Sequence, residues 1–146
     1  MRKRSAKFEK IVKLAASEER RYAEATGASQ QRLNEQIDRL GELSAYRHNY
    51  SRDASNSRIT SAAQLKDYQS FLDRLDQAVA AQQQIINDCE LMLERHRRHW
   101  MSKKHRLESL ERVRERYQRE EQQVADRQAQ RVADDRRPMA KRFDPE

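Results

Sequence analysis

Apolar side chains recur at alternate steps of three and four residues through the second half of the chain, and this repeat limits the folds available to it. It begins at Leu65 and reaches Arg131 without a change of register, and thirteen of its twenty positions are apolar or Cys. No Gly or Pro lies between Glu42 and Arg137. A 3.5-residue period kept over this length predicts a coiled-coil helix rather than the wider apolar stripe of a globular helix. The repeat positions are Leu65, Tyr68, Leu72, Leu75, Val79, Gln82, Ile86, Cys89, Leu93, His96, Trp100, Lys103, Leu107, Leu110, Arg114, Tyr117, Glu121, Val124, Gln128 and Arg131.

The composition agrees with long helices. Of the 146 residues, 36% are hydrophobic and 38% are charged, and there are only two Gly and two Pro. A compact domain of several elements needs more turn-forming residues than this. Such a composition is typical of long helices or of disordered chains, and the unbroken apolar repeat favours the helix.

The start of this helix is marked by a capping pattern. Ser61 and Gln64 match the capping box, in which each side chain satisfies a backbone N–H at the helix start. The preceding run SRDASNS, residues 51–57, is small and polar without periodicity, which predicts a turn.

The first part of the chain carries a weaker apolar repeat. It changes phase between Ala25 and Leu33, and Gly27 in this gap indicates a kink or weak point. Its positions are Phe8, Ile11, Ala15, Tyr22, Ala25, Leu33, Ile37, Leu40, Leu43, Tyr46 and Tyr50.

Together the two repeats predict an all-α fold, an antiparallel two-helix coiled-coil hairpin with unequal arms. We expect a first helix over residues 1–50, a polar turn over 51–60, a second, longer helix over 61–133 and a basic flexible tail over 134–146. At ~1.5 Å per residue, arms of about 46 and about 70 residues measure roughly 70 Å and 105 Å. The second helix should therefore outrun the first somewhere beyond Leu107. Its apolar repeat nevertheless continues through Leu110, Tyr117 and Val124, which predicts a partner outside the hairpin.

Residues that could support catalysis or hold a cofactor are not suitably arranged. Gly27 and Gly41 stand too far apart for a phosphate-binding loop, and a two-helix coil offers no concave site for a catalytic group. Cys89 and His96 would lie about 10 Å apart on a helix, too far to ligate one ion. Cys89 is therefore expected to be a small packing residue. We expect no enzyme, cofactor, metal or small-molecule substrate.

The N-terminal sequence and the single Cys predict a cytoplasmic protein. Glu9, Lys10 and Lys13 break the apolar stretch that follows the basic start, so no continuous signal-peptide core is present. No window approaches the ~20 apolar residues of a membrane span, and one Cys fits a reducing compartment.

A run of cations without acids occupies residues 95–106, RHRRHWMSKKHR. With the net charge of +7, it favours an acidic partner. Because the cations spread around the helix and Trp100 lies in the apolar repeat, an acidic protein surface or a solvated helix face is favoured over nucleic acid. The six cations are Arg95, Arg97, Arg98, Lys103, Lys104 and Arg106.

Aromatic side chains gather near the predicted turn. Tyr46 and Tyr50 end the first arm, and Tyr68 and Phe71 begin the second. Phe71 lies beside the repeat and begins a second apolar ridge that a two-helix coil cannot fill, so we interpret the ridge as an exposed docking patch. A wide local core that holds three aromatic side chains is the alternative. The ridge positions are Phe71, Leu75, Ala78 and Gln82.

At these residues the chain resembles the FliJ family, small cytoplasmic coiled-coil proteins of the bacterial flagellar export apparatus. The likeness covers nearly the whole chain, but before Arg39 and after Val124 only the general character of the sequence is similar. Arg39 and Gln82 depart from the family pattern. The matching features are Leu43 with the Y-x-x-x-Y pair Tyr46 and Tyr50, ITS at residues 59–61, YQxF at 68–71 with Leu75 and Ala78, then Trp100, Lys103, Lys104, Leu107 and LESLER at 107–112.

The resemblance implies a non-enzymatic rod that looks like the central stalk of rotary ATPases. Such a rod associates with the hexameric export ATPase, escorts unloaded export chaperones and contacts the cytoplasmic domain of the membrane export gate. It would reach the cytoplasmic side of the inner membrane only through these proteins. Because their apolar repeat has no partner within the predicted hairpin, we expect Leu110, Tyr117 and Val124 to bind the ATPase. The gate-binding positions that it implies are Leu43, Tyr46, Tyr50, Phe71, Leu75 and Ala78.

Two alternatives stay open from the sequence. The stalk of a virulence-type type III secretion system would have the same coiled coil. A generic basic coiled-coil scaffold that binds nucleic acid is the other, and it would show affinity that falls steeply with salt.

Overall fold

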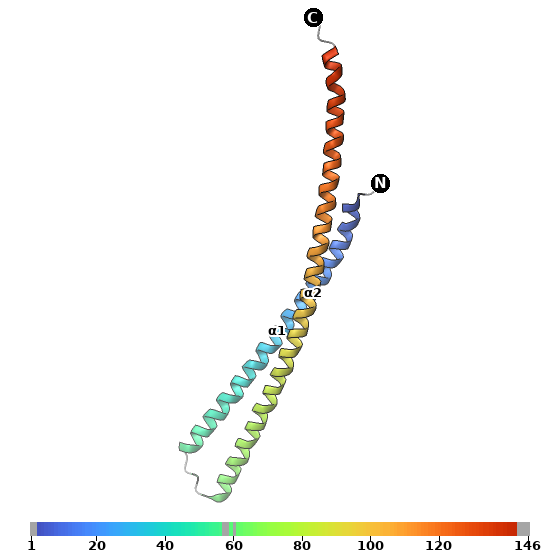
Figure 1. Cartoon of the computed structure of the whole chain (residues 1–146). Helices are drawn as coiled ribbons and strands as arrows, with labels where there is room; N and C mark the ends of the chain where they lie inside the picture. Colours follow the sequence, from blue (N-terminus) through green and yellow to red (C-terminus); the bar gives the residue numbers. More distant parts are fainter. Residues whose placement is uncertain (1–2, 57–58, 60, 143–146) are drawn as a thin grey trace. The chain divides into compact units, whose positions relative to one another are not determined.

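The computed structural model describes residues 3–56, 59 and 61–142, with side chains as far as residue 136. It contains two helices, α1 (Arg4–Asn56) and α2 (Ala62–Arg142), which pack against each other (Figure 1). The described residues include no strand. The prediction of an all-α helical hairpin is confirmed. Among the described residues, no helix is long and apolar enough to cross a membrane.

Both helices extend further than the sequence indicated. Residues 51–56, expected in the turn, form the end of α1, and residues 134–142, expected in the flexible tail, continue α2. The hydroxyl of Ser55 donates a hydrogen bond to the carbonyl of Arg52 at 2.8 Å, so a polar side chain of this run is satisfied within the helix. The rest of the expected turn and tail, residues 57–58, 60 and 143–146, lies outside the described residues.

The predicted cap of the second helix is present. The N–H of Gln64 donates to the hydroxyl oxygen of Ser61 at 3.2 Å, and the N–H of Leu65 donates to the Ser61 carbonyl, also at 3.2 Å. The Ser61 side chain therefore satisfies a backbone donor that the first turn leaves without an intrahelical partner, and its carbonyl accepts the first hydrogen bond of the helix.

The apolar repeat of α2 is the face that packs on α1. Every repeat position from Tyr68 to Glu121 is buried or half-buried. Beyond these limits Leu65 is 44% exposed and Val124 is 51% exposed. The predicted register is therefore confirmed over residues 68–121.

The repeat predicted for α1 is wrong at several positions. Ile11, Ile37 and Tyr46, which we expected to face α2, are 44%, 47% and 53% exposed. The helix continues through Gly27, and a single register holds along all of α1, so the predicted phase shift is also wrong. The heptad positions of α1, all buried or half-buried, are Phe8, Val12, Ala15, Glu19, Tyr22, Thr26, Ser29, Leu33, Gln36, Leu40, Leu43, Arg47, Tyr50 and Ala54.

Buried polar side chains account for this difference. The hydroxyl of Thr26 donates to the carbonyl of Tyr22 at 2.8 Å. The side-chain amide of Gln82 on α2 donates to the backbone carbonyl of Gln36 at 2.9 Å and to its Oε1 at 2.8 Å. A buried polar group is tolerated when it is hydrogen-bonded, so polar residues occupy seam positions that an apolar pattern passes over.

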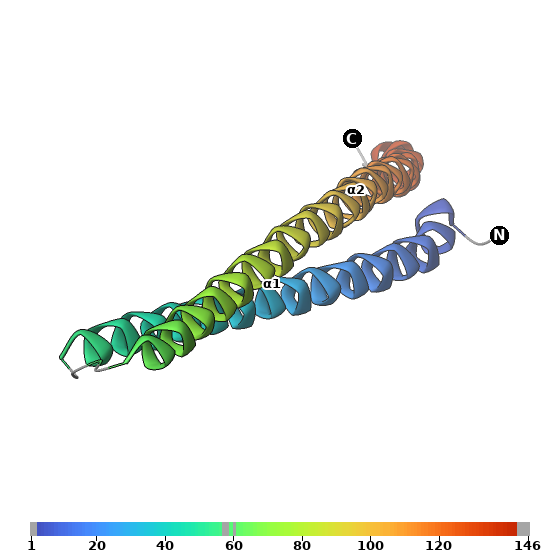
Figure 2. The same cartoon turned by 90° about the horizontal axis from the view of Figure 1, so that it is seen from below.

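Packing divides the chain into two compact units. One comprises residues 21–100, with the turn, and in it α1 and α2 run antiparallel, as Figure 2 shows from below. Its core contains Leu33, Ile86, Cys89 and Leu93, with Leu40 packed against them. The other unit comprises residues 1–20 and 101–146.

Candidate docking surfaces

Four aromatic side chains pack together at the turn end of the hairpin, and we call this group the tip cluster: Tyr46, Tyr50, Tyr68 and Phe71. The Tyr50 and Tyr68 rings are stacked with centroids 5.5 Å apart. Phe71 lies 4.4 Å from Tyr50 and 6.3 Å from Tyr46, centroid to centroid. Such offset and edge-on arrangements are the preferred geometries of aromatic pairs, so the cluster joins the two helices where they approach the turn.

The position of Phe71 corrects our interpretation of the second ridge. Its side chain is half-buried against two tyrosines of α1 rather than turned to solvent. Leu75 and Gln82, the ridge positions on the seam, are each only 8% exposed. The alternative of a wide local core therefore describes the packing better. Of the tip cluster, Tyr46 presents the largest exposed fraction, 53%.

Two surface hollows flank the tip cluster. One is bounded by Tyr50, Tyr68 and Phe71 together with polar residues of α2. The other is bounded by Leu43 and Tyr46 together with Arg39 and others. The six positions predicted to bind the export gate thus lie within a few turns of one another. Leu75 is buried, Tyr46 is exposed and the other four are half-buried. Whether they bind a partner stays a prediction.

An ion pair lies beside the tip cluster. Arg47 of α1 donates to the carboxylate of Asp76 of α2. Both side chains are about half-exposed, so a pair of this kind contributes little to stability. The hydrogen bond to Asp76 raises the pKa of Arg47.

The second unit shows that α1 reaches further along α2 than expected. The Phe8 and Tyr117 rings meet edge to face, with centroids 5.3 Å apart. The backbone N–H and the hydroxyl of Ser5 donate to the two carboxylate oxygens of Glu121 at 3.1 and 2.6 Å. α2 therefore outruns α1 only after Glu121, and Leu110 and Tyr117, which we expected to lack a partner within the hairpin, lie in its paired part.

The unpaired part of α2 begins after Glu121. All described side chains from residue 122 to 136 are exposed, and they include Val124 and Val132 at 51% and 52%. Of the three positions predicted to bind the ATPase, Leu110 and Tyr117 are half-buried in the hairpin, and Val124 alone lies on this free segment. We call residues 122–136 the free segment.

Five of the six cations of the basic run are exposed, and Lys103 is half-buried. In the unit of residues 21–100, Arg97 donates to the side chain of Gln30 at 3.0 Å and Arg98 pairs with Glu94 at 3.1 Å. In the other unit, Lys103 pairs with Glu18 at 3.4 Å. The remaining cations, Arg95, Lys104 and Arg106, are exposed.

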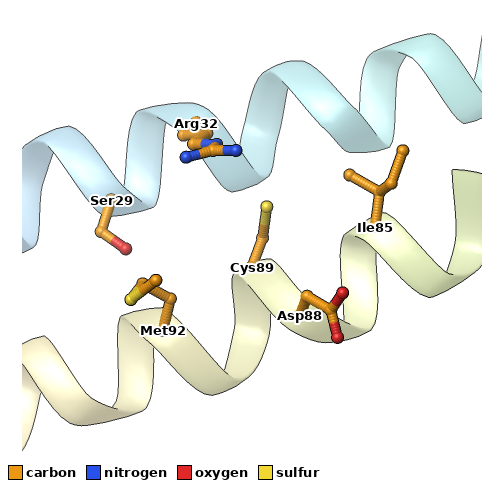
Figure 3. Close-up of a pocket in the computed structure, with 6 residues that line it drawn as sticks. All are labelled: Ser29, Arg32, Ile85, Asp88, Cys89 and Met92. Carbon is orange, nitrogen blue, oxygen red and sulfur yellow. The ribbon is translucent and has the colours of Figure 1, made fainter.

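A pocket that our sequence analysis missed lies between the helices (Figure 3). It has a volume of about 170 Å³. Ser29 and Arg32 of α1 line it from one side, and Ile85 and Met92 of α2 from the other, with Cys89 at its floor. The sequence signal for it was the seven-residue spacing of Phe71, Ala78, Ile85 and Met92, whereas the ridge that we predicted ran through Phe71, Leu75, Ala78 and Gln82.

No three His, Cys, Asp or Glu side chains within the described residues are grouped so that they could hold a metal ion.

Comparison with known proteins identifies the family. The family model described as "Flagellar FliJ protein" matches residues 4–141. No curated protein and no solved structure matches the chain. The match spans both helices almost completely and agrees with the resemblance that the tip residues suggested. The chain therefore belongs to the flagellar FliJ protein family and has a role in flagellar protein export.

Proposed function

We propose that the protein is a non-enzymatic component of flagellar export that couples the export ATPase hexamer to the cytoplasmic domain of the export gate and escorts export chaperones. The observation that carries this proposal is the family match over residues 4–141. It would act in the cytoplasm and meet the inner membrane only through its protein partners.

The tip cluster supports the gate part of the proposal. It is an aromatic group at the end of a hairpin, and aromatic side chains are enriched among the residues that dominate binding energies. Tyr46 is about half-exposed, so a partner can bury further area on its ring. Phe71, which itself packs on Tyr50, contacts that ring edge-on.

The free segment supports the ATPase part of the proposal. A helix as charged as residues 122–136 has no apolar core of its own and gains stability from packing on another surface. Val124 and Val132 are the large apolar residues exposed on it. We propose that the ATPase covers Val124 and its neighbours, and that Leu110 and Tyr117 act indirectly by holding α2 against α1.

The test is a pull-down of the full chain with the purified export ATPase and the purified gate domain. Binding of both supports the proposal. Binding of neither would remove it, and binding of one would restrict the role to that partner.

A further inference from the structure

A buried pair of glutamines connects the two helices in the unit of residues 21–100. The side-chain amide of Gln82 donates to the backbone carbonyl of Gln36 at 2.9 Å and to its Oε1 at 2.8 Å. Both residues are only 8% exposed. The other buried polar residue among those described, Thr26, bonds to the carbonyl of Tyr22 on its own helix. The bond between Gln36 and Gln82 is therefore the buried polar contact that depends on how α1 and α2 are aligned.

The apolar repeat leaves that alignment open. On α2 it is regular from Tyr68 to Leu93, and the seam of α1 keeps a single register. Sliding one helix past the other by seven residues, about 10 Å along the axis, therefore places seam positions against seam positions again. Burial of apolar side chains alone distinguishes poorly between the observed alignment and a slipped one.

The exposed contacts of this unit also depend on the alignment, but they select it weakly. Arg47 pairs with Asp76, and both side chains are about half-exposed. Arg97 bonds to Gln30 at an exposed site. After a slip, water would solvate these groups, so the loss is small. The rings of the tip cluster are exposed or half-buried, and they would find other apolar seam residues to pack on.

The chain near the turn does not fix the alignment either. The last residues of α1, 51–56, are exposed or half-buried and contain no apolar repeat. The helix loses little packing if it ends a few residues earlier, and the residues so released lengthen the connection to α2. A longer connection costs little entropy, because the cost of closing a loop rises slowly with its length.

A slip costs more at the two glutamines. Seven residues to either side of Gln82 along α2 lie Leu75 and Cys89, which are both buried. A slip of seven residues in either direction therefore sets Gln36 beside an apolar side chain and removes its donor. A buried polar group without a hydrogen bond is strongly disfavoured, whereas an exposed group regains bonds to water.

We propose that the bond between Gln36 and Gln82 is a register lock, which selects the one alignment of α1 and α2 among those that the apolar repeat allows. A single buried polar position fixes the register of a coiled coil in this way, at some cost in stability. The lock also brings Tyr50 onto Tyr68, whose stacked rings belong to the same alignment. This inference goes beyond the proposed function and does not depend on any partner.

Crosslinking of cysteine pairs reports the alignment. The rings of Tyr22 and His99 meet edge to face with centroids 6.1 Å apart. Met92 lies seven residues before His99, is exposed like it, and would take its place opposite Tyr22 after a slip. In a Cys89→Ala background, Tyr22→Cys is therefore combined either with His99→Cys, for the observed alignment, or with Met92→Cys, for the slipped one.

A short bismaleimide is the probe, and mass spectrometry of the monomer detects the intramolecular crosslink. With both glutamines present, the His99→Cys pair should react about tenfold more than the Met92→Cys pair, since loss of a buried hydrogen bond costs about this factor. Comparable reaction of the two pairs would show that the glutamines do not hold one alignment, and would overturn the register lock.

Moving one glutamine tests the lock directly. Ser29 lies seven residues before Gln36, so Gln36→Leu with Ser29→Gln offers Gln82 its partner one heptad away. The preference should then reverse, about tenfold in favour of the Met92→Cys pair. An unchanged preference for the His99→Cys pair would overturn the register lock, because other contacts would then set the alignment.

Removing both glutamines gives a second measurement. Gln36→Leu with Gln82→Leu leaves no buried amide at these positions, so the variant should keep its helicity in circular dichroism. Both cysteine pairs should then react to a comparable extent, because neither alignment strands a polar group. Reaction of the His99→Cys pair alone would overturn the register lock, even where the variant with the moved glutamine fails to fold.

Discussion

Truncation of Tyr46 separates docking from packing at the tip cluster. The ring is 53% exposed and makes one edge-on contact with Phe71, at 6.3 Å. Loss of a fully buried aromatic side chain costs about 3–5 kcal/mol, and an aromatic pair contributes about 0.5–1.5 kcal/mol. Because half of the ring is in solvent, Tyr46→Ala should lower the free energy of unfolding by only about 1 kcal/mol. Its effect on gate binding should be larger, about 2 kcal/mol or thirtyfold in Kd, if the ring is a docking anchor.

Two further variants complete this experiment. Phe71→Ala removes a half-buried ring with two aromatic contacts and should cost about 2 kcal/mol of stability as well as gate affinity. Ile37→Ala is the control, because Ile37 has a similar exposure, 47%, on the other side of the seam. It should lose about 1 kcal/mol of stability and no gate affinity.

The measurements are urea unfolding followed by circular dichroism and calorimetric titration with the gate domain. The reasoning is refuted if Tyr46→Ala and Ile37→Ala weaken gate binding to the same extent. It is also refuted if Tyr46→Ala costs about as much stability as a fully buried ring, since the ring would then be core.

Three other predictions concern the seam and the free segment. Gln82→Leu should destabilise the hairpin by about 1–3 kcal/mol in urea unfolding because it leaves the buried amide of Gln36 without its donor. The double variant Gln36→Leu, Gln82→Leu should recover most of that loss. A double variant as unstable as the single one would contradict this role of the hydrogen bond. The hydrogen bond from Ser5 holds the pKa of Glu121 below its ordinary value of 4.5. The stabilisation that the Glu121 carboxylate contributes is therefore complete above pH 4.5 and is lost as the pH falls below it. Ser5→Ala should flatten the pH dependence of the melting temperature in this acidic range, and an unchanged pH profile would contradict the role of the bond. Truncation after Glu121 should leave the melting temperature nearly unchanged, because all described side chains beyond it are exposed, while it weakens ATPase binding; undiminished ATPase binding would show that the free segment is not the contact.

The sequence predicted α2 better than α1, and the reason lies in which residues fill the seam. On α2 the seam is mostly apolar from Tyr68 to Leu93, so hydrophobic periodicity is enough to find it. On α1 the seam includes Thr26, Gln36 and Arg47, and exposed residues such as Ile37 imitate seam positions. The partners that make those polar positions acceptable, such as Gln82, lie on the other helix and cannot be recognised before the two helices are aligned.

The tip cluster was found from the sequence, but its packing was not. The spacing of Tyr46, Tyr50, Tyr68 and Phe71 placed them near one turn. Phe71 lies against α1 because Tyr46 and Tyr50 widen the packed interface at the tip enough to include it. This contact between the two helices cannot be read from the spacing within either one. The pairing of Leu110 and Tyr117 within the hairpin was missed for a similar reason. Residues 51–56 lengthen α1, and the contact of Ser5 with Glu121 shows how far the pairing continues.

The most direct test of a coupling role is whether one copy of the chain binds the ATPase and the gate domain at the same time. The full chain, the purified ATPase and the purified gate domain are mixed, and the mass of each complex is measured by light scattering after size-exclusion chromatography. Because the tip cluster and the free segment share no residues, the two partners should bind together in one complex of the summed mass. Competition between them, so that each displaces the other from the chain, would contradict the proposal that this protein couples the two.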